Sequence, residues 1–482
     1  EEGVFLDEKP DRFGVTSGTT GVGKLIPFTE FYWAASVFSG KLMRHASSRP
    51  SAVQKHCYVY THCKPPLTKS GVTIAAYSYI STKDPSRYVD YSSPQPAFTI
   101  SDDCASTYVH MLFAIADPNL GQMRSFVSPQ LYRALGCLET NWQAMLEDLS
   151  TGKINATLPL DPDVRRSLQG YLRPDQDRVT QLRREFEKGF EGIAKRIWPH
   201  LAALEAVDIV GFRKKLQATY GKGALCSSGM FGCTEAGNFA INMWVDEEEP
   251  RYVLLPHACV FEFIPEKQIF GKDPQCLFLD EIEVGGRYEL VLTTRSGLYR
   301  YRNGDVIQVV GFHENCPVIR MLYRKGEYLN VCQERTAMGL VTSAVNDAVK
   351  GWPGFELVDW ACAESVLFDS SHSELFYVLF VEVDSDKGVL NVSAEQRSQF
   401  DESLRRRHDQ YEGCRDSRII APARVHLVRP GTFSELRDFI VSRTTASFNQ
   451  YKAPRKLRSR ESLEWMMERV YESSQEFNSR HY

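Results

Sequence analysis

The sequence predicts a mixed α/β protein built from more than one domain. Short apolar runs bounded by turn residues dominate residues 52–115 and return in 252–312, which is the pattern of β-strands. Between these regions, residues 129–220 carry apolar side chains at helical spacing. A different pattern begins after residue 325. We therefore expect a large first domain over residues 1–325 and a smaller α+β domain over 326–482.

In the first region, strands are expected to alternate with helices. Residues 57–61 and 108–113 are examples of its short apolar runs. In the second region, six large apolar residues recur at helical spacing from Leu131 to Leu149. A second helical stretch with many charges runs from Leu182 to Leu204. We interpret both helical stripes as core packing.

Strand patterns then dominate the end of the large domain. They begin at Tyr252, Val260, Tyr288 and Val306. The segment Arg-Lys-Gly-Glu at 324–327 is interpreted as the link to the smaller domain. Beyond that link we expect a helix near 335–349, a strand around 376–383, a charged helix near 394–411 and a strand over 423–428.

Composition excludes some classes of partner. The chain has 482 residues, a formal net charge of −4 and a pI near 6.3, so the total charge indicates no nucleic-acid partner and no membrane-surface partner. The run Arg405–Arg407 is interpreted as a solvated helix face. No apolar run of membrane-spanning length and no signal-peptide pattern is visible. Membrane association stays open, because the chain begins Glu-Glu-Gly and is expected to be shortened at its start.

The cysteines indicate a reducing compartment. There are twelve of them, and no C-x-x-C pair occurs among them. His62 and Cys63 are neighbours without the spacing of a metal site. Scattered cysteines in a chain of this length are typical of reduced core residues, so we expect a cytoplasmic protein.

Residues 16–24 form the most informative stretch and read Thr-Ser-Gly-Thr-Thr-Gly-Val-Gly-Lys. Its three glycines let the backbone approach an anion closely. Four hydroxyls and one positive charge come from Thr16, Ser17, Thr19, Thr20 and Lys24. Open amides, hydroxyls and a lysine together suit a polyphosphate.

The loop of nucleotide triphosphatases, G-x-x-x-x-G-K-[ST], matches this stretch only in part. Gly18 to Lys24 satisfies the first seven positions, but Leu25 stands where a hydroxyl should hold Mg²⁺. That lysine should also open a helix, whereas Pro27 pushes Ile26 towards extended geometry. A purely structural Gly/Thr turn is another alternative. The remaining interpretation is a Ser/Thr-rich loop that holds phosphate as adenylate-forming enzymes do.

Three later segments supply the other parts of a nucleotide site. In Met-Phe-Gly-Cys-Thr-Glu-Ala-Gly at 230–237, Phe231 can stack on adenine and Glu235 can help to hold Mg²⁺. Asp305 follows an Asn-Gly turn and can accept hydrogen bonds from both ribose hydroxyls. Lys452, in an extended basic segment, can neutralise charge on an α-phosphate. Each segment alone also fits an ordinary turn or a solvated tail, but their order and spacing together favour a nucleotide site.

This order of segments resembles the Gretchen Hagen family of acyl acid amido synthetases, a branch of the adenylate-forming superfamily. The resemblance extends over nearly the whole chain. Residues 298–317 are its most specific part, and Gln-Tyr-Lys-Ala-Pro-Arg at 450–455 is the next. The segments at 323–331, 422–428 and 454–458 are similar to the animal branch rather than to the plant hormone-conjugating enzymes.

The resemblance implies an adenylate-forming enzyme fold. Such a fold has a large N-terminal domain of β-barrel and α/β sandwich, and a small mobile α+β C-terminal domain. It also implies that ATP, with Mg²⁺, activates a carboxylic acid as an acyl-adenylate, from which the acyl group passes to the amine of an amino acid.

The family's site residues carry over onto positions of this chain. The implied phosphate loop consists of Thr16, Ser17, Gly18, Thr19, Thr20 and Lys24. The implied adenine and Mg²⁺ loop consists of Phe231, Gly232, Cys233, Thr234 and Glu235. Asp305 is the implied ribose ligand, with Arg324 assisting beside the hinge. Lys452 and Glu235 are the implied catalytic residues, and Glu235 is the implied metal ligand.

The chain departs from the family pattern in three places. Phe231 and Cys233 stand where Tyr and Ser or Ala are usual, so the ring keeps its stacking face but loses a hydroxyl. The phosphate loop is one residue shorter than in plant members. Only fifteen residues precede the loop, which indicates a shortened start.

Two rival functions stay open: a non-catalytic nucleotide-binding or scaffold protein on the same fold, and an adenylate-forming enzyme with a thiol acceptor. The animal branch also adds the endoplasmic reticulum or nuclear envelope as an alternative location.

Overall fold

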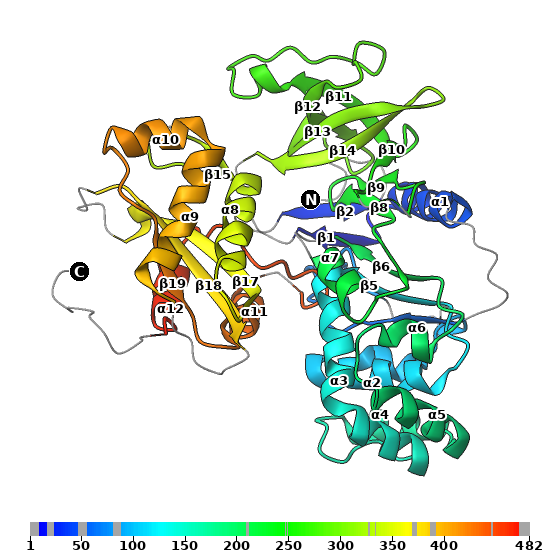
Figure 1. Cartoon of the computed structure of the whole chain (residues 1–482). Coiled ribbons are helices and arrows are strands. Elements are labelled where there is room, and N and C mark those ends of the chain that lie inside the picture. Colours follow the sequence, from blue (N-terminus) through cyan, green and yellow to red (C-terminus); the bar gives the residue numbers. More distant parts are fainter. Residues whose placement is uncertain are drawn as a thin grey trace. The chain divides into compact units, whose positions relative to one another are not determined.

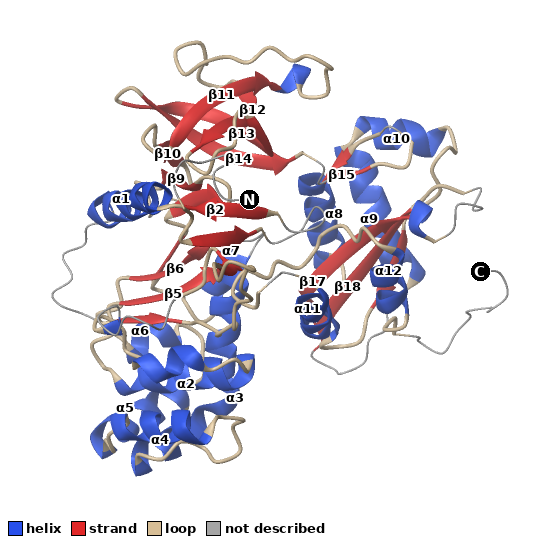
Figure 2. Ribbon diagram, turned by 180° about the vertical axis from the view of Figure 1, so that it is seen from behind, coloured by secondary structure: helices blue, strands red, loops and turns tan. Residues whose placement is uncertain are grey.

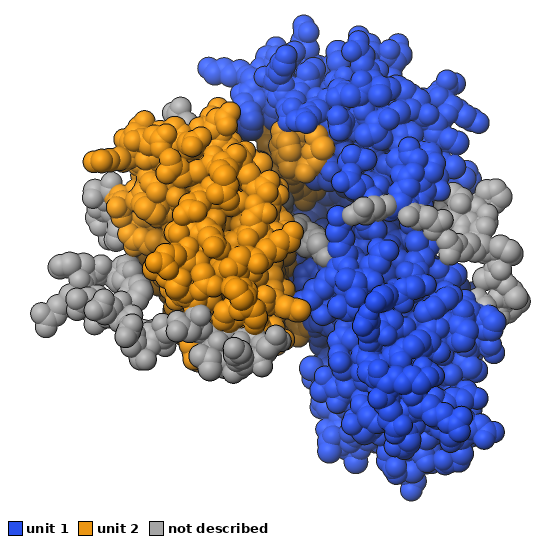
Figure 3. All heavy atoms as spheres, in the orientation of Figure 1, with its two compact units in different colours: residues 1–303, 307–321, 444–452 blue, residues 304–306, 322–443, 453–482 orange. Residues whose placement is uncertain are grey.

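The computed structural model describes residues 9–16, 24–46, 55–80, 88–208, 212–245, 247, 249–325, 328–332, 334–368, 374–385, 392–444 and 447–471. The chain divides into two compact units (Figure 3). Unit 1 contains residues 1–303, 307–321 and 444–452, and unit 2 contains 304–306, 322–443 and 453–482. The two units therefore alternate along the sequence.

One half of unit 1 is a parallel sheet covered by helices (Figure 1). Its strands, in the order β3-β5-β6-β7, are β3 (His56–Tyr58), β5 (Gln122–Val127), β6 (Ala203–Val207) and β7 (Leu225–Ser227). Parallel neighbours need long crossover connections. The helices in these connections are α2 (Asp103–Ala116), α3 (Ser128–Thr151), α4 (Pro162–Tyr171), α5 (Gln176–Phe186), α6 (Ile193–Ile197) and α7 (Phe212–Ala218), with a short 3₁₀ helix at Gln95–Thr99.

The apolar stripe of residues 131–149 is confirmed as the buried face of α3. Leu131, Leu135, Leu138, Met145 and Leu149 are all buried in one core. Gly152 ends the helix in the left-handed conformation, with a φ of 69°, which costs least for glycine.

Two expectations for this half need correction. Residues 108–113, an example of the short apolar runs, lie inside α2 rather than in a strand. All six of these residues are buried, so the helix lacks the polar stripe by which a sequence reveals helical periodicity. In the stretch expected to be mainly helical, residues 203–207 form strand β6.

The other half of unit 1 is built on a seven-stranded sheet. Its order is β11-β12-β13-β14-β10-β9-β8. The strands are β8 (Met230–Cys233), β9 (Gly237–Ile241), β10 (Tyr252–Leu254), β11 (Cys259–Pro265), β12 (Arg287–Thr294), β13 (Tyr301–His313) and β14 (Cys316–Arg324). The four expected strands in this region are confirmed as β10 to β13.

A small sheet and one helix complete unit 1. The sheet joins β2 (Leu25–Phe28), β1 (Arg12–Val15) and β4 (Thr73–Ala76) in that order. Helix α1 (Glu30–Ala46) packs against β9. Since β1 and β2 are antiparallel partners, the hydroxyl-rich loop is the connection between them.

Unit 2 is a three-stranded sheet with helices on both faces (Figure 2). The strands are β17 (Phe355–Glu364), β18 (Tyr377–Ser385) and β19 (Arg424–Leu427), in that order. Helices α8 (Met338–Lys350) and α9 (Ala394–Arg407) enclose one core, and α11 (Thr432–Arg443) and α12 (Arg460–Met467) enclose the other. Strands β15 (Tyr328–Leu329) and β16 (Thr336–Ala337) pair separately, and 3₁₀ turns occur at Glu266–Gln268 in unit 1 and Ser365–Leu367 in unit 2.

The expected charged helix at 394–411 is two helices in the structure. Helix α9 ends at Arg407, and α10 (Asp409–Asp416) follows after His408, whose backbone is extended at φ −144° and ψ 96°. The other expected elements of this unit are confirmed as α8, β18 and β19. The mixed α/β class is therefore correct.

Within the described residues, none of the helices has both the length and the apolar character that crossing a bilayer requires. All twelve cysteines are described and none forms a disulfide. Cys57, Cys226, Cys259 and Cys362 are buried, whereas Cys63 and Cys104 are exposed.

Candidate nucleotide site

The two ends of the hydroxyl-rich loop are tied to each other. The Thr16 N–H donates to the Lys24 carbonyl at 3.1 Å, and the Lys24 N–H donates to Thr16 Oγ1 at 2.9 Å. The two ends of the loop are therefore held together at the end of the β1–β2 pair. Ser17, Gly18, Thr19 and Thr20 lie outside the described residues.

The expected adenine and Mg²⁺ loop is a tight β-hairpin, formed by β8 and β9. A Cβ on Gly232 would lie 2.2 Å from the Gly237 carbonyl oxygen, so only glycine allows the two strands to approach this closely. Gly237 itself has a φ of 72°. These two glycines set the hairpin geometry that brings Thr234 and Glu235 to its tip.

Two hydroxyl groups from other elements hold the hairpin tip. The Tyr32 hydroxyl of α1 donates to the Thr234 carbonyl at 2.9 Å, and the Ser296 hydroxyl donates to the Glu235 carbonyl at 2.7 Å. Burial raises the pKa of Tyr32 well above its usual value, so this phenol stays a neutral donor. The Glu235 backbone is thus fixed on both sides.

The Glu235 side chain is joined to Lys24 through a tyrosine. Lys24 Nζ donates to the Tyr301 hydroxyl at 2.9 Å, and that hydroxyl donates to Glu235 Oε1 at 2.7 Å. Lys24 Nζ and Glu235 Oε1 are 3.9 Å apart. The lysine side chain is 56% exposed and the glutamate side chain 10%. We call Lys24, Tyr301 and Glu235 the loop-base cluster.

Phe231 lies in the same hairpin and is half-buried. Its ring packs edge-on against Phe239, with centroids 5.3 Å apart, and at a tilt of 34° against Tyr252, at 5.5 Å. These contacts fix the plane of the ring. Cys233, two residues on, is half-buried as well.

Asp305 and Arg324 form a second part of the expected site, and both belong to unit 2. Arg324 Nε donates to Asp305 Oδ1 at 2.7 Å, and Nη2 donates to Oδ2 at 3.3 Å. The Asp305 side chain is only 3% exposed. This two-point contact fixes the carboxylate in one orientation. Gly304, the residue before it within β13, has a φ of 83°.

Lys452 is the last residue of a segment that belongs to unit 1. Asn449, three residues earlier, is buried, and its side chain holds that segment against unit 1. Asn449 Oδ1 accepts from the Thr61 N–H and from Gln130 Nε2, both at 2.9 Å, and Nδ2 donates to the Thr61 carbonyl at 2.8 Å. Lys452 therefore follows a fixed point of unit 1, although the rest of the C-terminal region belongs to unit 2.

The donor set of unit 1 fits Mg²⁺ only if the ligand supplies most of the oxygens. Among the described residues, no group of three or more His, Cys, Asp or Glu side chains could hold a metal ion. Glu235 offers one carboxylate beside the ends of the phosphate loop. One carboxylate plus phosphate oxygens and water is an arrangement that Mg²⁺ accepts.

The structure brings Lys24 and Glu235 together in unit 1, and Asp305 and Arg324 together in unit 2. Sequence reasoning missed Tyr301, which links Lys24 to Glu235, and it missed Tyr32 and Ser296, which hold the hairpin tip. Tyr301 lies within residues 298–317, the segment whose resemblance to the family is most specific, so that segment could have indicated Tyr301 as a site residue.

The architecture described above is a mixed α/β fold, with a candidate nucleotide site built on loops and hairpins of its sheets. Three family models match this chain: the GH3 family N-terminal domain over residues 1–221, the central domain over 252–324 and the C-terminal domain over 340–461. The chain belongs to the GH3 family, the Gretchen Hagen family that the sequence motifs resemble.

The chain is similar to proteins of both animals and plants. It is 31% identical over 365 residues to a GH3 domain-containing protein of Mus musculus, covering 75% of this chain and 65% of that protein. It is 30% identical over 379 residues to the indole-3-acetic acid-amido synthetase GH3.3 of Arabidopsis thaliana, covering 76% and 63%. The chain thus spans slightly less than two thirds of the length of these relatives.

A solved structure supports the fold. The AtGH3.15 acyl acid amido synthetase in complex with 2,4-DB superposes with a TM-score of 0.82 at 24% identity, covering 97% of this chain and 83% of that one.

Proposed function

We propose that this chain is an ATP-dependent acid–amino acid ligase. It would activate a carboxylic acid as an acyl-adenylate and transfer the acyl group to the amine of an amino acid. The observation that carries the proposal is the loop-base cluster, which places a lysine and a buried carboxylate at the ends of a hydroxyl-rich loop. Relatives named as amido synthetases support the same reaction.

Adenylation requires the enzyme to bring two anions together, a carboxylate and a triphosphate. Positioning and electrostatic stabilisation therefore supply most of the catalysis. In this proposal, Ser17, Thr19, Thr20 and the loop amides hold the β- and γ-phosphates. Lys24 adds a positive charge at the base of the loop, and Tyr301 keeps it directed beside Glu235.

Glu235 is the residue that would hold Mg²⁺. The ion, when bound, neutralises phosphate charge. Glu235 is suited to this role because its backbone is fixed by Ser296 and its carboxylate is oriented by Tyr301. Tyr301 donates to one carboxylate oxygen, and a carboxylate has further lone pairs to offer.

Asp305 would bind the ribose hydroxyls, and Arg324 would keep the Asp305 carboxylate in the orientation that the ribose needs. Lys452 would stabilise the negative charge that develops on the α-phosphate during adenylation. Transfer to the amine follows after the small domain has moved, and such a motion can limit the rate.

The first experiment measures ATP–pyrophosphate exchange that depends on an added carboxylic acid. A panel that includes indole-3-acetic acid and 2,4-DB is appropriate, because one relative is named for the first acid and a similar protein was solved in complex with the second. We expect exchange with at least one acid and a loss of about 10²-fold in Glu235→Gln. Glu262→Gln is the matched control, because Glu262 is a buried carboxylate of the same sheet that pairs with Arg300 instead.

Lys452→Ala separates catalysis from binding. We expect exchange to fall about 10²- to 10³-fold while ATP affinity changes little, because the lysine acts on charge that develops during the reaction. Arg458→Ala, in the same basic segment, is the control. Normal exchange in Lys452→Ala would remove this residue from the mechanism.

The acceptor and the rival functions are decided by product analysis. An amino-acid-dependent amide supports the ligase, and a thioester that forms only with a free thiol supports a thiol acceptor. If ATP with Mg²⁺ gives no thermal shift in the parent or in Asp305→Ala, the non-catalytic scaffold replaces the proposal.

We also propose a cytoplasmic location. The twelve cysteines that form no disulfide are consistent with a reducing compartment. Cell fractionation of the full protein tests this, and recovery with the endoplasmic reticulum or nuclear envelope would contradict it.

A further inference from the structure

The chain passes from unit 1 to unit 2 for the last time between Lys452 and Ala453. Lys452, the residue to which the proposed function assigns the α-phosphate, therefore stands at this crossing. Buried polar side chains hold the chain on both sides of it. Asn449 holds it in unit 1, and Arg455 holds it in unit 2. The position of Lys452 is thus decided by these two anchors.

The Asn449 side chain binds unit 1 as one peptide group binds another in a sheet. Its Oδ1 accepts from the Thr61 N–H at 2.9 Å, and its Nδ2 donates to the Thr61 carbonyl at 2.8 Å. Gln130 Nε2 donates to the same Oδ1 at 2.9 Å. All three residues are buried. The pairing needs a side chain that both accepts and donates, and the amide of asparagine does so.

The groups that receive Asn449 are themselves fixed. Thr61 lies just beyond strand β3, and its Oγ1 donates to Asp103 Oδ1 at 2.8 Å. Arg133 donates to the other oxygen of Asp103 at 2.9 Å. Asp103 is the first residue of α2, and Gln130 and Arg133 both belong to α3. Asn449 is therefore joined to the parallel sheet and to two helices of unit 1.

Arg455 holds the chain on the other side of Lys452. Its Nη1 pairs with Asp359 and donates to the Trp360 carbonyl, and its Cζ lies 4.7 Å from the centroid of the Trp360 ring. Its carbonyl accepts from the Cys362 N–H at 2.8 Å. Asp359, Trp360 and Cys362 all belong to β17. The Arg455 side chain is 10% exposed, so this anchor is nearly buried.

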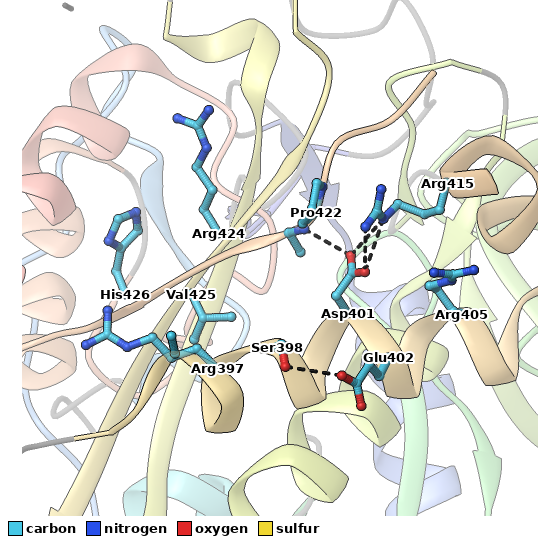
Figure 4. Close-up of a pocket in the computed structure, with 12 residues that line it drawn as sticks. Arg397, Ser398, Asp401, Glu402, Arg405, Arg415, Pro422, Arg424, Val425 and His426 are labelled. Atoms are coloured by element: carbon cyan, nitrogen blue, oxygen red, sulfur yellow. Dashed lines mark hydrogen bonds and ion pairs between the residues drawn. The ribbon is translucent and has the colours of Figure 1, made fainter. Parts of the chain in front are cut away.

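The sheet that carries the Arg455 anchor is tied to its helices by buried polar groups as well. Figure 4 shows Asp401 of α9, whose carboxylate accepts from the Arg415 guanidinium and, at 2.9 Å, from the Ala423 N–H. Ala423 precedes β19, the strand at the other end of the order β17-β18-β19. Arg455 is therefore fixed to a packed unit rather than to a loop.

The length of chain between the anchors limits where Lys452 can lie. Lys452 is the third residue after Asn449 and the third before Arg455. Three residues of extended chain span at most about 11 Å. While the Asn449 hydrogen bonds are intact, the Lys452 Cα therefore stays within this distance of the Asn449 Cα. Since Lys452 itself belongs to unit 1, these bonds confine it there.

We propose that Asn449 is a positioning residue for Lys452, an inference that rests on the adenylation role proposed for that lysine. Asn449 acts through the main chain: it fixes the backbone three residues before Lys452, so that the ammonium group reaches the α-phosphate from a fixed point of unit 1. A catalytic group that is misplaced by about 1 Å can lose about 10²-fold in rate. The flexible lysine stem absorbs part of such a shift, so we expect a smaller loss when the anchor is removed.

The test is carboxylate-dependent ATP–pyrophosphate exchange in a double-mutant cycle of Asn449→Ala and Lys452→Ala. We expect Asn449→Ala to lower kcat about 10-fold and to leave the KM for ATP unchanged, because Lys452 acts on charge that develops during the reaction. In the Lys452→Ala background, Asn449→Ala should cause no further loss, since the group that it positions is gone. A general weakening of the fold would lower the rate in both backgrounds.

Two further variants separate positioning from folding, with all rates measured where circular dichroism shows each variant to be folded. Ser106→Ala is the matched control, because the buried Ser106 hydroxyl donates to the Tyr60 carbonyl at 2.6 Å, one residue before Thr61. It should lower stability and leave exchange unchanged. Gln130→Met removes one of the three hydrogen bonds of Asn449 at similar volume. It should lower kcat less than Asn449→Ala does, and only while Lys452 is present.

Hydrogen exchange of the backbone amides tests the anchor without turnover. Amides of residues 447–452 should exchange faster in Asn449→Ala than in the parent, because exchange reports local opening. Ser106→Ala should leave their exchange as it is in the parent. Equal exchange of these amides in Asn449→Ala and in the parent would overturn the anchor itself.

Two kinetic results would overturn the positioning role: an unchanged kcat in Asn449→Ala, and an equal loss in both backgrounds of the cycle. Failure of the proposed function looks different. If the parent catalyses no exchange with any carboxylic acid, or if Lys452→Ala exchanges at the parent rate, the role of Lys452 fails and the inference fails with it. If the parent is active and Lys452→Ala is not, an additive cycle removes Asn449 alone.

Discussion

At the scale of single residues, Tyr301 is the most informative side chain. Its hydroxyl accepts from Lys24 and donates to Glu235, so it sets the direction of both charged groups. Without it, Lys24 and Glu235 would have only a long contact of 3.9 Å, and a pair at that distance whose lysine is exposed contributes little to order.

We expect Tyr301→Phe to lower kcat/KM for adenylation about 10-fold and to leave the fold intact. The ring keeps its packing, and the two hydrogen bonds that orient the charges are lost, each worth about 1–3 kcal/mol. Pyrophosphate exchange measures the effect. Tyr299→Phe is the control, because Tyr299 is 81% exposed. Equal rates in both variants would show that Tyr301 has no positioning role.

His110 makes the stability of unit 1 depend on pH. The residue is completely buried, and its pKa is lowered to about 4 by that burial. Its Nε2–H donates to the Tyr60 carbonyl at 2.9 Å, so Nδ1 is the acceptor for the Ser93 hydroxyl at 2.8 Å. The neutral ring is therefore bonded at both nitrogens.

We expect the free energy of unfolding to fall by about 3 kcal/mol between pH 6.5 and pH 4 because of His110. In this range the unfolded chain binds a proton at this histidine and the folded chain does not, so lower pH favours unfolding. Urea titrations at several pH values measure the slope. His110→Gln should flatten it, whereas the exposed His200→Gln should not; an unchanged slope in His110→Gln would contradict the assignment.

Cys332 and Cys414 are the third informative feature at this scale. Their Sγ atoms are 3.4 Å apart and come from positions 82 residues apart. Burial and the hydrogen bond to Cys414 raise the pKa of Cys332 to about 12.

We expect hydrogen peroxide to link these two thiols into a disulfide. One thiol is oxidised to a sulfenic acid while the peroxide is reduced to water, and the other thiol then displaces a second water from the sulfenic acid. A bridge of this loop length raises the free energy of unfolding by up to ~4 kcal/mol. Peptide mass mapping detects the link, and Cys332→Ser is the control. Oxidation of Cys63 or Cys104 without this link would contradict the prediction.

At the scale of elements, the sequence predicts best where one face of an element is buried. Helix α3 was predictable from its stripe of Leu131 to Leu149, because its other face is polar. Helix α2 was not, because its residues from Ala105 to Ile115 are all buried and no periodicity remains. The break at His408 between α9 and α10 was missed because charged residues continue on both sides.

The same reasoning applies to the site. Lys24 and Glu235 were predictable from local motifs, because each lies in a short glycine-containing segment that can be recognised in the sequence by itself. The link through Tyr301 was not predictable, because it joins residues 277 positions apart and depends on how β13 is placed in the sheet.

The β8–β9 hairpin offers a test at this scale. We expect Gly232→Ala to lower the free energy of unfolding by about 1–3 kcal/mol, because its Cβ would meet the Gly237 carbonyl at 2.2 Å and Asn238 Cα at 3.0 Å. Adenylation should fall further, since Glu235 would move with the tip. Gly311→Ala in β13 is the control, because nothing lies within 4 Å of its Cβ position. Wild-type stability in Gly232→Ala would mean that the hairpin can open without cost.

At the scale of the whole molecule, the two units are interleaved in sequence. Residues 444–452 belong to unit 1, although residues 322–443 and 453–482 on either side of them belong to unit 2. Residues 304–306 belong to unit 2, although the rest of strand β13 belongs to unit 1. Buried Asn449 ties residues 444–452 to unit 1, because its side chain pairs with the backbone N–H and carbonyl of Thr61.

We expect a fragment of residues 1–325 to be less stable than the same unit in the whole chain. Without Asn449, the buried N–H and carbonyl of Thr61 lose their partners, at a cost of about 1–3 kcal/mol each. Urea unfolding of the fragment, with and without a synthetic peptide of residues 444–452, measures this. The peptide should raise the midpoint, and a peptide with Asn449→Ala should not; equal effects of the two peptides would contradict the assignment.

The pairing of Thr61 with Asn449 also governs when the protein can finish folding on the ribosome. The two residues are 388 positions apart, so synthesis of the intervening chain takes roughly 20 to 80 seconds at ordinary translation rates. During that interval the backbone N–H and carbonyl of Thr61 lack the Asn449 side chain with which they pair. Residues 444–452 therefore complete unit 1 only after most of unit 2 has been made, and a nascent chain stalled before residue 449 would remain a substrate for chaperones.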